Sequence, residues 1–177
     1  MKLPAVKQAF WRDKKRWWRA AAVIPIAIAA KLLSLYVTPN YGILLERTID
    51  GCLPWAVYWW DKKASVLPLQ RYDLVLFPAR GMMPVIEDDQ PIGKMVAGLP
   101  GDRVKIEAGN VFINDAFIGD VHYGAKKLGK PVSYWDKTYT LGKDEIFVYG
   151  SEEHSWDSRY WGSYPLHLVR GRIAAVY

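Results

Sequence analysis

The chain contains the stretch Pro91-Ile92-Gly93-Lys94-Met95-Val96-Ala97-Gly98-Leu99-Pro100-Gly101-Asp102, an apolar run that a lysine opens and a turn closes. The run predicts a strand that enters a core, with Lys94 at its start, and Pro100-Gly101 predicts a tight turn after it. A lysine in this position either keeps its ammonium in water at the strand end or is a buried amine with a chemical role.

Two other stretches bear on that choice. The first contains the chain's only cysteine, in Cys52-Leu53-Pro54-Trp-Ala-Val-Tyr58-Trp59, and the preceding Asp50-Gly51 predicts a turn that presents the thiol. The second is Gly150-Ser-Glu-Glu-His-Ser155-Trp-Asp157-Ser158-Arg159-Tyr160-Trp161-Gly162, which follows a predicted strand.

Together the three stretches resemble the type I signal peptidase family, a set of serine–lysine peptidases. Lys94-x-x-x-Gly98-x-Pro100-Gly101-Asp102 is similar to the family's Lys-Arg-x-x-Gly-x-Pro-Gly-Asp, and the late stretch is similar to its Ser-x-Asp-Ser-Arg-Tyr-Trp-Gly. The resemblance covers most of the chain beyond the first 40 residues. Within the family, Cys52-Leu53-Pro54 looks closest to the conjugative-transfer branch, the TraF-type pilin maturation peptidases, which carry Ser-Leu-Pro there.

The resemblance implies a role for each matched residue. Cys52 takes the position of the nucleophile, Lys94 that of the general base, and Ser155 that of the serine that orients the lysine. An unperturbed lysine has a pKa of about 10.4 and is protonated at neutral pH. Because burial without a carboxylate partner lowers the pKa of an amine, a lysine base is expected inside an apolar strand.

The resemblance also implies residues that support the reaction. We expect Asp157 and Arg159 to hold the motif loop in place without transferring a proton. We expect the backbone N–H of Cys52 to donate to the tetrahedral oxyanion. The family's second donor is a hydroxyl two residues before the nucleophile, where this chain has Asp50, whose carboxylate would repel an oxyanion unless protonated or turned away. Thr48 is the expected replacement donor.

The nucleophile itself departs from the family, since sulfur stands where the family has oxygen. A thiol ionises more readily than a hydroxyl, and a neighbouring ammonium favours the thiolate, so the resting pair is either neutral or Cys⁻/Lys⁺. An alternative is a Cys–His dyad in which His154 folds over Cys52. Otherwise His122, His154 and His167 are expected to be surface or hydrogen-bonded histidines.

The N-terminal region predicts a membrane anchor. Residues 1–19 carry seven basic side chains and one acidic one, which equals the net charge of +6 of the whole chain. Residues 17–37 are predominantly apolar over the roughly 20 positions needed to cross a bilayer. Lys31 lies six residues before Val37, from where its ammonium can reach the far interface. The basic flank predicts a single-pass anchor of the bacterial inner membrane, with residues 1–16 in the cytoplasm and residues 38–177 in the periplasm. The alternative, a cleaved signal peptide, lacks a convincing small-x-small site.

Residues 38–177 predict a mainly β, signal-peptidase-like domain after one N-terminal transmembrane helix, because short apolar runs alternate with turn signals. Residues 79–92 are expected to be a loop, and residues 120–135 a long surface loop. The expected strands, besides the one that begins at Lys94, are 42–49, 58–60, 72–77, 104–106, 111–113, 116–118, 147–149 and 171–177.

Composition argues against several classes of protein. The chain beyond residue 19 has equal numbers of basic and acidic side chains, which gives no support to a nucleic-acid-binding surface. One cysteine excludes an internal disulfide. The acidic run Glu87-Asp88-Asp89 lacks the histidines or spaced partners of a metal site, so neither a metal nor another cofactor is expected.

The sequence therefore predicts a membrane-anchored peptidase that cleaves, and in one alternative cyclises, a propilin or another membrane-tethered preprotein through a Cys–Lys dyad. One rival is a catalytically inactive assembly protein of the transfer apparatus, motivated by Cys52 and Asp50. A second rival is a general type I signal peptidase. A self-cleaving repressor with a related dyad is disfavoured by the membrane segment and by the lack of a DNA-binding head.

Overall fold

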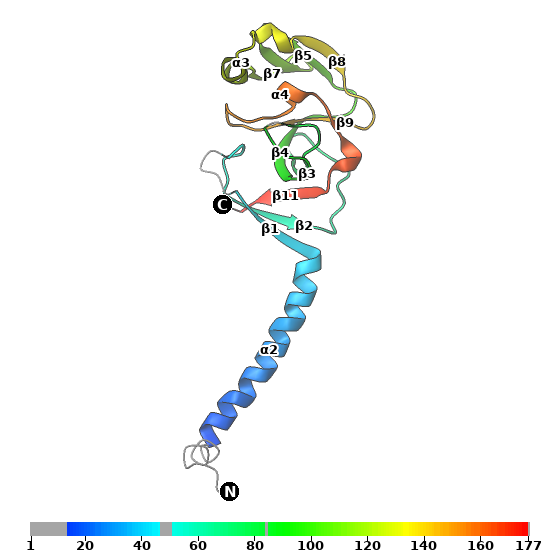
Figure 1. The fold of residues 1–177 in the computed structure, drawn as a ribbon. Coiled ribbons are helices and arrows are strands. Elements are labelled where there is room, and N and C mark those ends of the chain that lie inside the picture. The colour runs from blue at the N-terminus through cyan, green and yellow to red at the C-terminus, as the bar shows by residue number, and fades with distance from the viewer. Residues whose placement is uncertain (1–13, 47–50, 84, 177) are drawn as a thin grey trace. The chain divides into compact units, whose positions relative to one another are not determined.

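The computed structural model describes residues 14–46, 51–83 and 85–176. The chain divides between Asn40 and Tyr41 into an N-terminal helical unit and a β unit, which are treated separately. Figure 1 shows both. In chain order the elements are α2 (Lys14–Asn40), β1 (Tyr41–Leu45), β2 (Val57–Asp61), β3 (Leu74–Pro78), β4 (Pro91–Gly98), β5 (Arg103–Glu107), β6 (Asn110–Ile113), β7 (Ala116–Asp120), α3 (His122–Leu128), η1 (Val132–Trp135), β8 (Lys137–Thr140), β9 (Glu145–Tyr149), α4 (Ser158–Trp161), β10 (Tyr164–Pro165), η2 (Leu166–Leu168) and β11 (Gly171–Ala175).

The helix α2 has the length and composition of a membrane span. Its segment Ala21–Asn40 has 20 residues and a mean hydropathy of 1.9. Within this segment Lys31 is the one charged residue, and apolar residues occupy all faces of the helix, which suits lipid better than packing along one face against a core. Pro25 and Pro39 lie inside it, as is tolerated in membrane helices. The predicted N-terminal apolar helix is thus confirmed, and it is consistent with a single-pass anchor.

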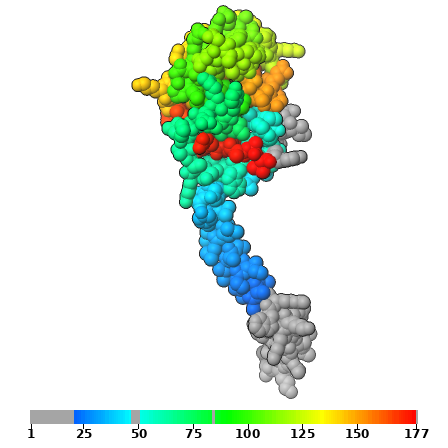
Figure 2. Space-filling model, turned by 180° about the vertical axis from the view of Figure 1, so that it is seen from behind, coloured from blue at the N-terminus to red at the C-terminus, as the bar shows by residue number. Residues whose placement is uncertain are grey.

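The β unit consists of two antiparallel sheets. The larger has seven strands in the order β1-β2-β11-β3-β4-β9-β10, and the smaller has four in the order β7-β6-β5-β8. The C-terminal strand β11 is inserted between β2 and β3, and it lies at the surface in Figure 2, where it is red. The expected mainly β fold is confirmed.

Strand β4 occupies an interior position in the larger sheet. It pairs with β3, and in this pairing Lys94 lies opposite Val75. Pairing with β9 begins only at Met95, opposite Tyr149, and a bulge follows Val96. Side chains alternate as the pleat requires, so that Ile92, Lys94 and Val96 are all buried.

The predicted turn after β4 is confirmed. Gly101 has a φ of +90°, a value that glycine adopts without strain. The Asp102 backbone N–H donates to the Leu99 carbonyl over 3.0 Å, and the Leu99 N–H donates to the Asp102 carboxylate over 2.6 Å. These two hydrogen bonds close the turn, after which the chain enters the smaller sheet at β5.

Two large apolar cores support the sheets, and the half-buried Trp156 packs against both. Burial of each large apolar side chain contributes about 1.5–3 kcal/mol. The core beneath the larger sheet includes Val75, Phe77, Met82, Ile92, Val96, Ile146, Val148 and Tyr164. The core beneath the smaller sheet includes Val104, Ile106, Val111, Ile113, Val121, Trp135, Phe147 and Tyr160.

Several expected boundaries are wrong. Residues 120–135 are not a surface loop, because they contain α3 and η1 and bury Val121, Ala125 and Trp135. The strand expected from Lys94 begins three residues earlier, at Pro91, because Ile92 pairs with Phe77. The strand expected from residue 72 begins at Leu74, since Tyr72 has a φ of +72°. The strand expected over 42–49 ends at Leu45, and residues 47–50 lie outside the described residues.

Candidate active site

Lys94 is a buried amine that bonds to a distant serine. Its side chain is fully buried, and its Nζ donates a hydrogen bond of 2.7 Å to Ser155 Oγ. In the described part of the chain no salt bridge involves Lys94. The solvated strand-end alternative is therefore wrong. A buried amine without a carboxylate partner is costly to keep charged, which makes this position unusual for a lysine.

Ser155 is held in place by the loop between β9 and α4. It is fully buried, and its backbone N–H donates to the Glu152 carbonyl over 3.0 Å. Its own carbonyl accepts a 3.2 Å hydrogen bond from Arg159 Nη2. Backbone contacts on both sides thus fix the hydroxyl that accepts from Lys94.

Asp157 and Arg159 form a buried, bidentate ion pair at the end of the same loop. Arg159 Nε donates to Asp157 Oδ1 over 2.8 Å, and Nη2 donates to Oδ2 over 2.9 Å. The Gly150 N–H also donates to Asp157 Oδ2, over 2.9 Å. Burial lowers the pKa of Arg159, but the hydrogen bonds and charge of Asp157 outweigh that effect, and the pKa is raised above its usual value. The pair therefore joins the two ends of the loop that carries Ser155.

The Cys52 segment lies against this loop. Cys52 is half-buried, and its carbonyl accepts a 3.5 Å hydrogen bond from the Glu152 N–H. A side chain at Gly150 would come within 2.1 Å of Ser155 Oγ and 2.6 Å of the Cys52 carbonyl oxygen. Lys94, Ser155 and the backbone of Cys52 are thus brought together from three separate parts of the sequence. No hydrogen bond to the Cys52 thiol is present among the described residues.

Gly150 is a residue that sequence reasoning did not single out. It is buried where two motif segments meet, and only a residue without a Cβ fits there. Its position just before the late motif was visible in the sequence. The need for a glycine was not, because the colliding Cys52 carbonyl comes from a segment far away in the chain.

The remaining expected site residues are placed only in part. Thr48 and Asp50 lie outside the described residues, so the Thr48 donor stays a prediction. His154 is half-buried, and its ring lies edge-on to that of Tyr123, with 6.4 Å between centroids. His122 pairs with Asp120 over 3.1 Å, and His167 contacts Asp144. The described ranges contain no cluster of three or more His, Cys, Asp or Glu side chains suited to a metal.

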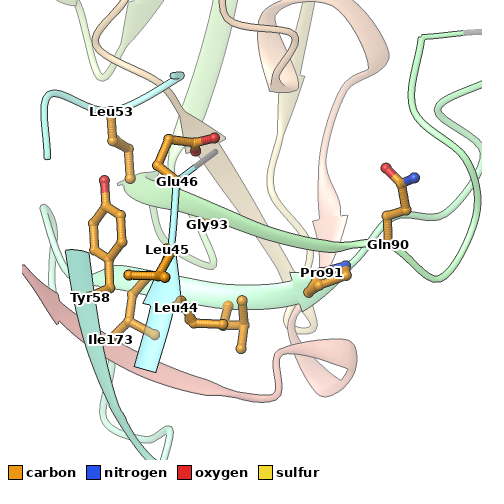
Figure 3. Close-up of a pocket in the computed structure, with 10 residues that line it drawn as sticks. Leu44, Leu45, Glu46, Leu53, Tyr58, Gln90, Pro91, Gly93 and Ile173 are labelled. Atoms are coloured by element: carbon orange, nitrogen blue, oxygen red, sulfur yellow. The ribbon is translucent and has the colours of Figure 1, made fainter. Parts of the chain in front are cut away.

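A pocket of about 350 Å³ adjoins the Cys52 and Lys94 segments, since Leu53 and Gly93 are both in its wall. Figure 3 shows Glu46, Leu53 and Tyr58 near one end and Gln90 at the other. Burial, and then the charge of Glu46, raise the pKa of the Tyr58 phenol. The Tyr58 hydroxyl donates a 2.8 Å hydrogen bond to the Trp55 carbonyl. The full lining is Leu44, Leu45, Glu46, Leu53, Tyr58, Leu76, Gln90, Pro91, Gly93 and Ile173.

Comparison with known proteins identifies the family of the chain. Residues 15–177 match the family model "Signal peptidase, peptidase S26". The chain is similar to the probable signal peptidase I-2 of Synechocystis sp., with 28% identity over 104 residues, and to signal peptidase I of Bacillus caldolyticus, with 24% identity over 170 residues. The first match spans 58% of this chain and 45% of the relative, and the second spans 90% and 87%.

A solved structure gives a further likeness. A signal peptidase I from Enterococcus faecalis V583 has 24% sequence identity and a TM-score of 0.39, and the match covers 61% of this chain and 98% of the solved one. The family model covers nearly the whole chain, including every motif described above. The chain therefore belongs to the signal peptidase family, peptidase S26.

Proposed function

We propose that the protein is a membrane-anchored peptidase that cleaves a propilin for conjugative transfer, with Cys52 as nucleophile and Lys94 as general base. The observation that carries this proposal is the buried Lys94 amine, bonded to Ser155 Oγ over 2.7 Å beside the Cys52 backbone. A lysine kept in an apolar strand next to a serine and a thiol-bearing turn has the features of a base in acyl transfer.

The reaction proceeds through a thioester. Lys94 takes the proton of the Cys52 thiol, or the two already form a thiolate–ammonium pair, and sulfur attacks the scissile carbonyl carbon. The Cys52 backbone N–H, and Thr48 as the proposed second donor, bind the oxyanion. The Lys94 ammonium then protonates the leaving amide nitrogen. Water, deprotonated by Lys94, releases the acyl fragment, whereas attack by the substrate's own amine would give a cyclic product.

Ser155, Asp157 and Arg159 hold other groups in place and do not react themselves. Ser155 Oγ accepts from Lys94 Nζ and so aims the amine toward the nucleophile. Asp157 and Arg159 fix the loop that carries Ser155, and neither transfers a proton. No metal or other cofactor takes part in this scheme.

The substrate would bind as an added β-strand. In the described part of the chain, β1 is an end strand of the larger sheet, and Pro91–Lys94 of β4 pair only with β3. Both segments line the same pocket. A peptide in extended conformation could pair with these free edges and bring its scissile bond to Cys52, with side chains entering the pocket.

The propilin is the narrower part of the proposal, because it rests on the resemblance of Cys52-Leu53-Pro54 to the conjugative branch. A general signal peptidase would use the same residues, and the relatives' names are equally consistent with that activity. In either case, residues 17–37 of α2 cross the bacterial inner membrane once. Residues 1–16 then remain in the cytoplasm, residues 38–177 lie in the periplasm, and no nucleic acid is bound.

The test is the intact mass of a substrate co-expressed with the full-length protein. The substrates are the cognate propilin and a preprotein with an ordinary signal peptide, each with wild-type protein, Cys52→Ala and the exposed control Ser65→Ala. Loss of mass from the propilin alone, abolished only by Cys52→Ala, supports the proposal, and a product lighter by one further water identifies cyclisation. Cleavage of both substrates identifies a general signal peptidase, and cleavage of neither identifies an assembly protein.

A further inference from the structure

The pocket beside the Cys52 segment combines an apolar floor with a carboxylate at its rim. Its volume of about 350 Å³ lies within the range of ligand sites and exceeds what a methyl group needs. Leu44, Leu53, Leu76 and Ile173 are among the apolar residues of its wall. A small side chain alone would leave much of this space unfilled.

Glu46 is the acidic residue of the lining, and it lies against Gly51, the residue that precedes Cys52. It is exposed to solvent. Its Cγ atom is 2.7 Å from the position that a Cβ would take at Gly51. Its charge also contributes, after burial, to the raised pKa of Tyr58. Glu46 therefore lies beside Gly51 and lines the same pocket as Tyr58.

The lining matches a side chain with a long apolar stem and a cationic end. Lysine and arginine bury their methylene groups along apolar surface and keep the charged head near water or a counter-ion. The leucine and isoleucine wall would receive the stem, and Glu46 at the rim would receive the charge. The Gln90 amide, at the other end of the pocket, carries no charge.

We propose that this pocket binds a lysine or arginine side chain of the substrate close to the scissile bond, and that Glu46 determines this preference. The inference rests on the proposed peptidase function and names the substrate class of that site. It distinguishes this chain from a peptidase whose pocket accepts only small neutral residues. The added β-strand supplies affinity through its backbone, while the pocket supplies specificity through one side chain.

The experiment uses the full-length protein in detergent and fluorescent peptides with small residues before the scissile bond, as the resemblance to signal peptidases implies. One set of peptides carries lysine, or its neutral isostere norleucine, at one of the three positions before the scissile bond. A second set carries glutamate or glutamine at the same positions. Cleavage is measured as kcat/KM, and affinity is measured by anisotropy with the Cys52→Ala protein. Both measurements are repeated with the Glu46→Gln and Glu46→Lys variants and with the control Glu107→Gln. The Glu107 carboxylate is exposed and pairs with Lys105 in the smaller sheet.

At one position we expect lysine to be preferred over norleucine by about two- to fivefold, the range of an exposed ion pair. Glu46→Gln should abolish that ratio, Glu46→Lys should favour glutamate over glutamine, and Glu107→Gln should retain the wild-type ratio. Raising the ionic strength should reduce the preference. A ratio near one at all three positions, or a lysine preference that survives Glu46→Gln, would overturn the inference.

The two readouts separate this inference from the proposed function. A lysine preference in binding that depends on Glu46, without any cleavage, supports the pocket assignment and overturns the peptidase proposal. Cleavage that depends on Cys52 but shows no lysine preference supports the peptidase and overturns the pocket assignment. Absence of both binding and cleavage overturns both.

Discussion

Lys94 and Ser155 are 61 positions apart in the sequence, and the Lys94 Nζ donates to Ser155 Oγ over 2.7 Å in the interior of the β unit. One lies on an interior strand of the larger sheet, and the other lies on the loop between β9 and α4. The contact therefore forms only when β4 and the late motif have both folded. It joins the two longest motifs of the sequence at a single hydrogen bond.

The Lys94 amine should be required for a high kcat but not for the thermal stability of the protein. Lys94→Met keeps the length of the side chain and removes the amine. We expect kcat for a cleaved preprotein to fall by about 10²- to 10⁴-fold, the range lost with a general base. The melting temperature should stay equal or rise, since an apolar side chain suits a buried site. The exposed Lys143→Met is the control, and a large loss of melting temperature without loss of kcat would contradict this role.

Ser155 should orient Lys94, and a second buried serine provides a matched control. Ser158 Oγ accepts from the Val148 N–H over 3.0 Å and does not contact Lys94. Both Ser155→Ala and Ser158→Ala leave a buried donor without its acceptor, which should lower the free energy of unfolding by about 1–3 kcal/mol. Only Ser155→Ala should also lower kcat, by on the order of 10²-fold. Equal effects of both variants on kcat would show that Ser155 has only a structural role.

The Asp157–Arg159 pair should stabilise the loop as a unit. Arg159→Met leaves the Asp157 carboxylate buried without its counter-ion and should lower the free energy of unfolding by about 3–5 kcal/mol. The double variant Asp157→Asn with Arg159→Met should lose much less than the sum of the single effects. Arg172→Met, at a half-exposed ion pair with a 3.7 Å separation, is the control. Urea titrations of the wild type, Asp157→Asn, Arg159→Met and the double variant measure the coupling, and strictly additive effects would refute it.

Asp102 should make the stability depend on pH at the acidic end. Burial raises the pKa of Asp102, but hydrogen bonds from Arg71, the Leu99 N–H and Asn114, together with the charge of Arg71, hold it below its usual value. A carboxyl with a lowered pKa in the folded state contributes stability above its unfolded pKa of about 3.9. That contribution is lost as the pH falls through the folded value.

Comparison with Asp102→Asn measures this contribution. The difference in unfolding free energy between wild type and Asp102→Asn should be largest near neutral pH and should shrink as the pH falls below about 4. Asp115→Asn, whose side chain is 75% exposed, is the control. A difference that stays constant from neutral to acidic pH would show that Asp102 acts only through its hydrogen-bond geometry.

The elements that the sequence predicted well are those specified by local chemistry. The predicted strands 104–106 and 111–113 become β5 and β6, which pair as a hairpin around Ala108-Gly109, where both residues have positive φ. The turn after β4 follows from Pro100-Gly101 in the same way. The apolar helix α2 follows from composition alone.

The parts that were missed depend on contacts between distant segments. Helix α3 has seven residues, too few for a clear helical period, and it is stabilised by burial of Val121 and Ala125 next to Trp135 and Tyr160. Burial of Lys94 could not be read from its own strand, because a lysine beside an apolar run also fits a solvated strand end. The resemblance predicted its partner Ser155, but it gave no indication of Gly150 or of the pocket at Glu46.

The most direct test of the central claim is the mass of the covalent intermediate. A cleavable preprotein is mixed with the full-length protein, the reaction is stopped with acid, and the intact protein and its Cys52 peptide are weighed. The account predicts an adduct of the N-terminal fragment on Cys52, which neutral hydroxylamine removes as expected for a thioester and which Cys52→Ala lacks. Continued cleavage by Cys52→Ala, or an adduct on any other residue, would contradict the claim that Cys52 is the nucleophile.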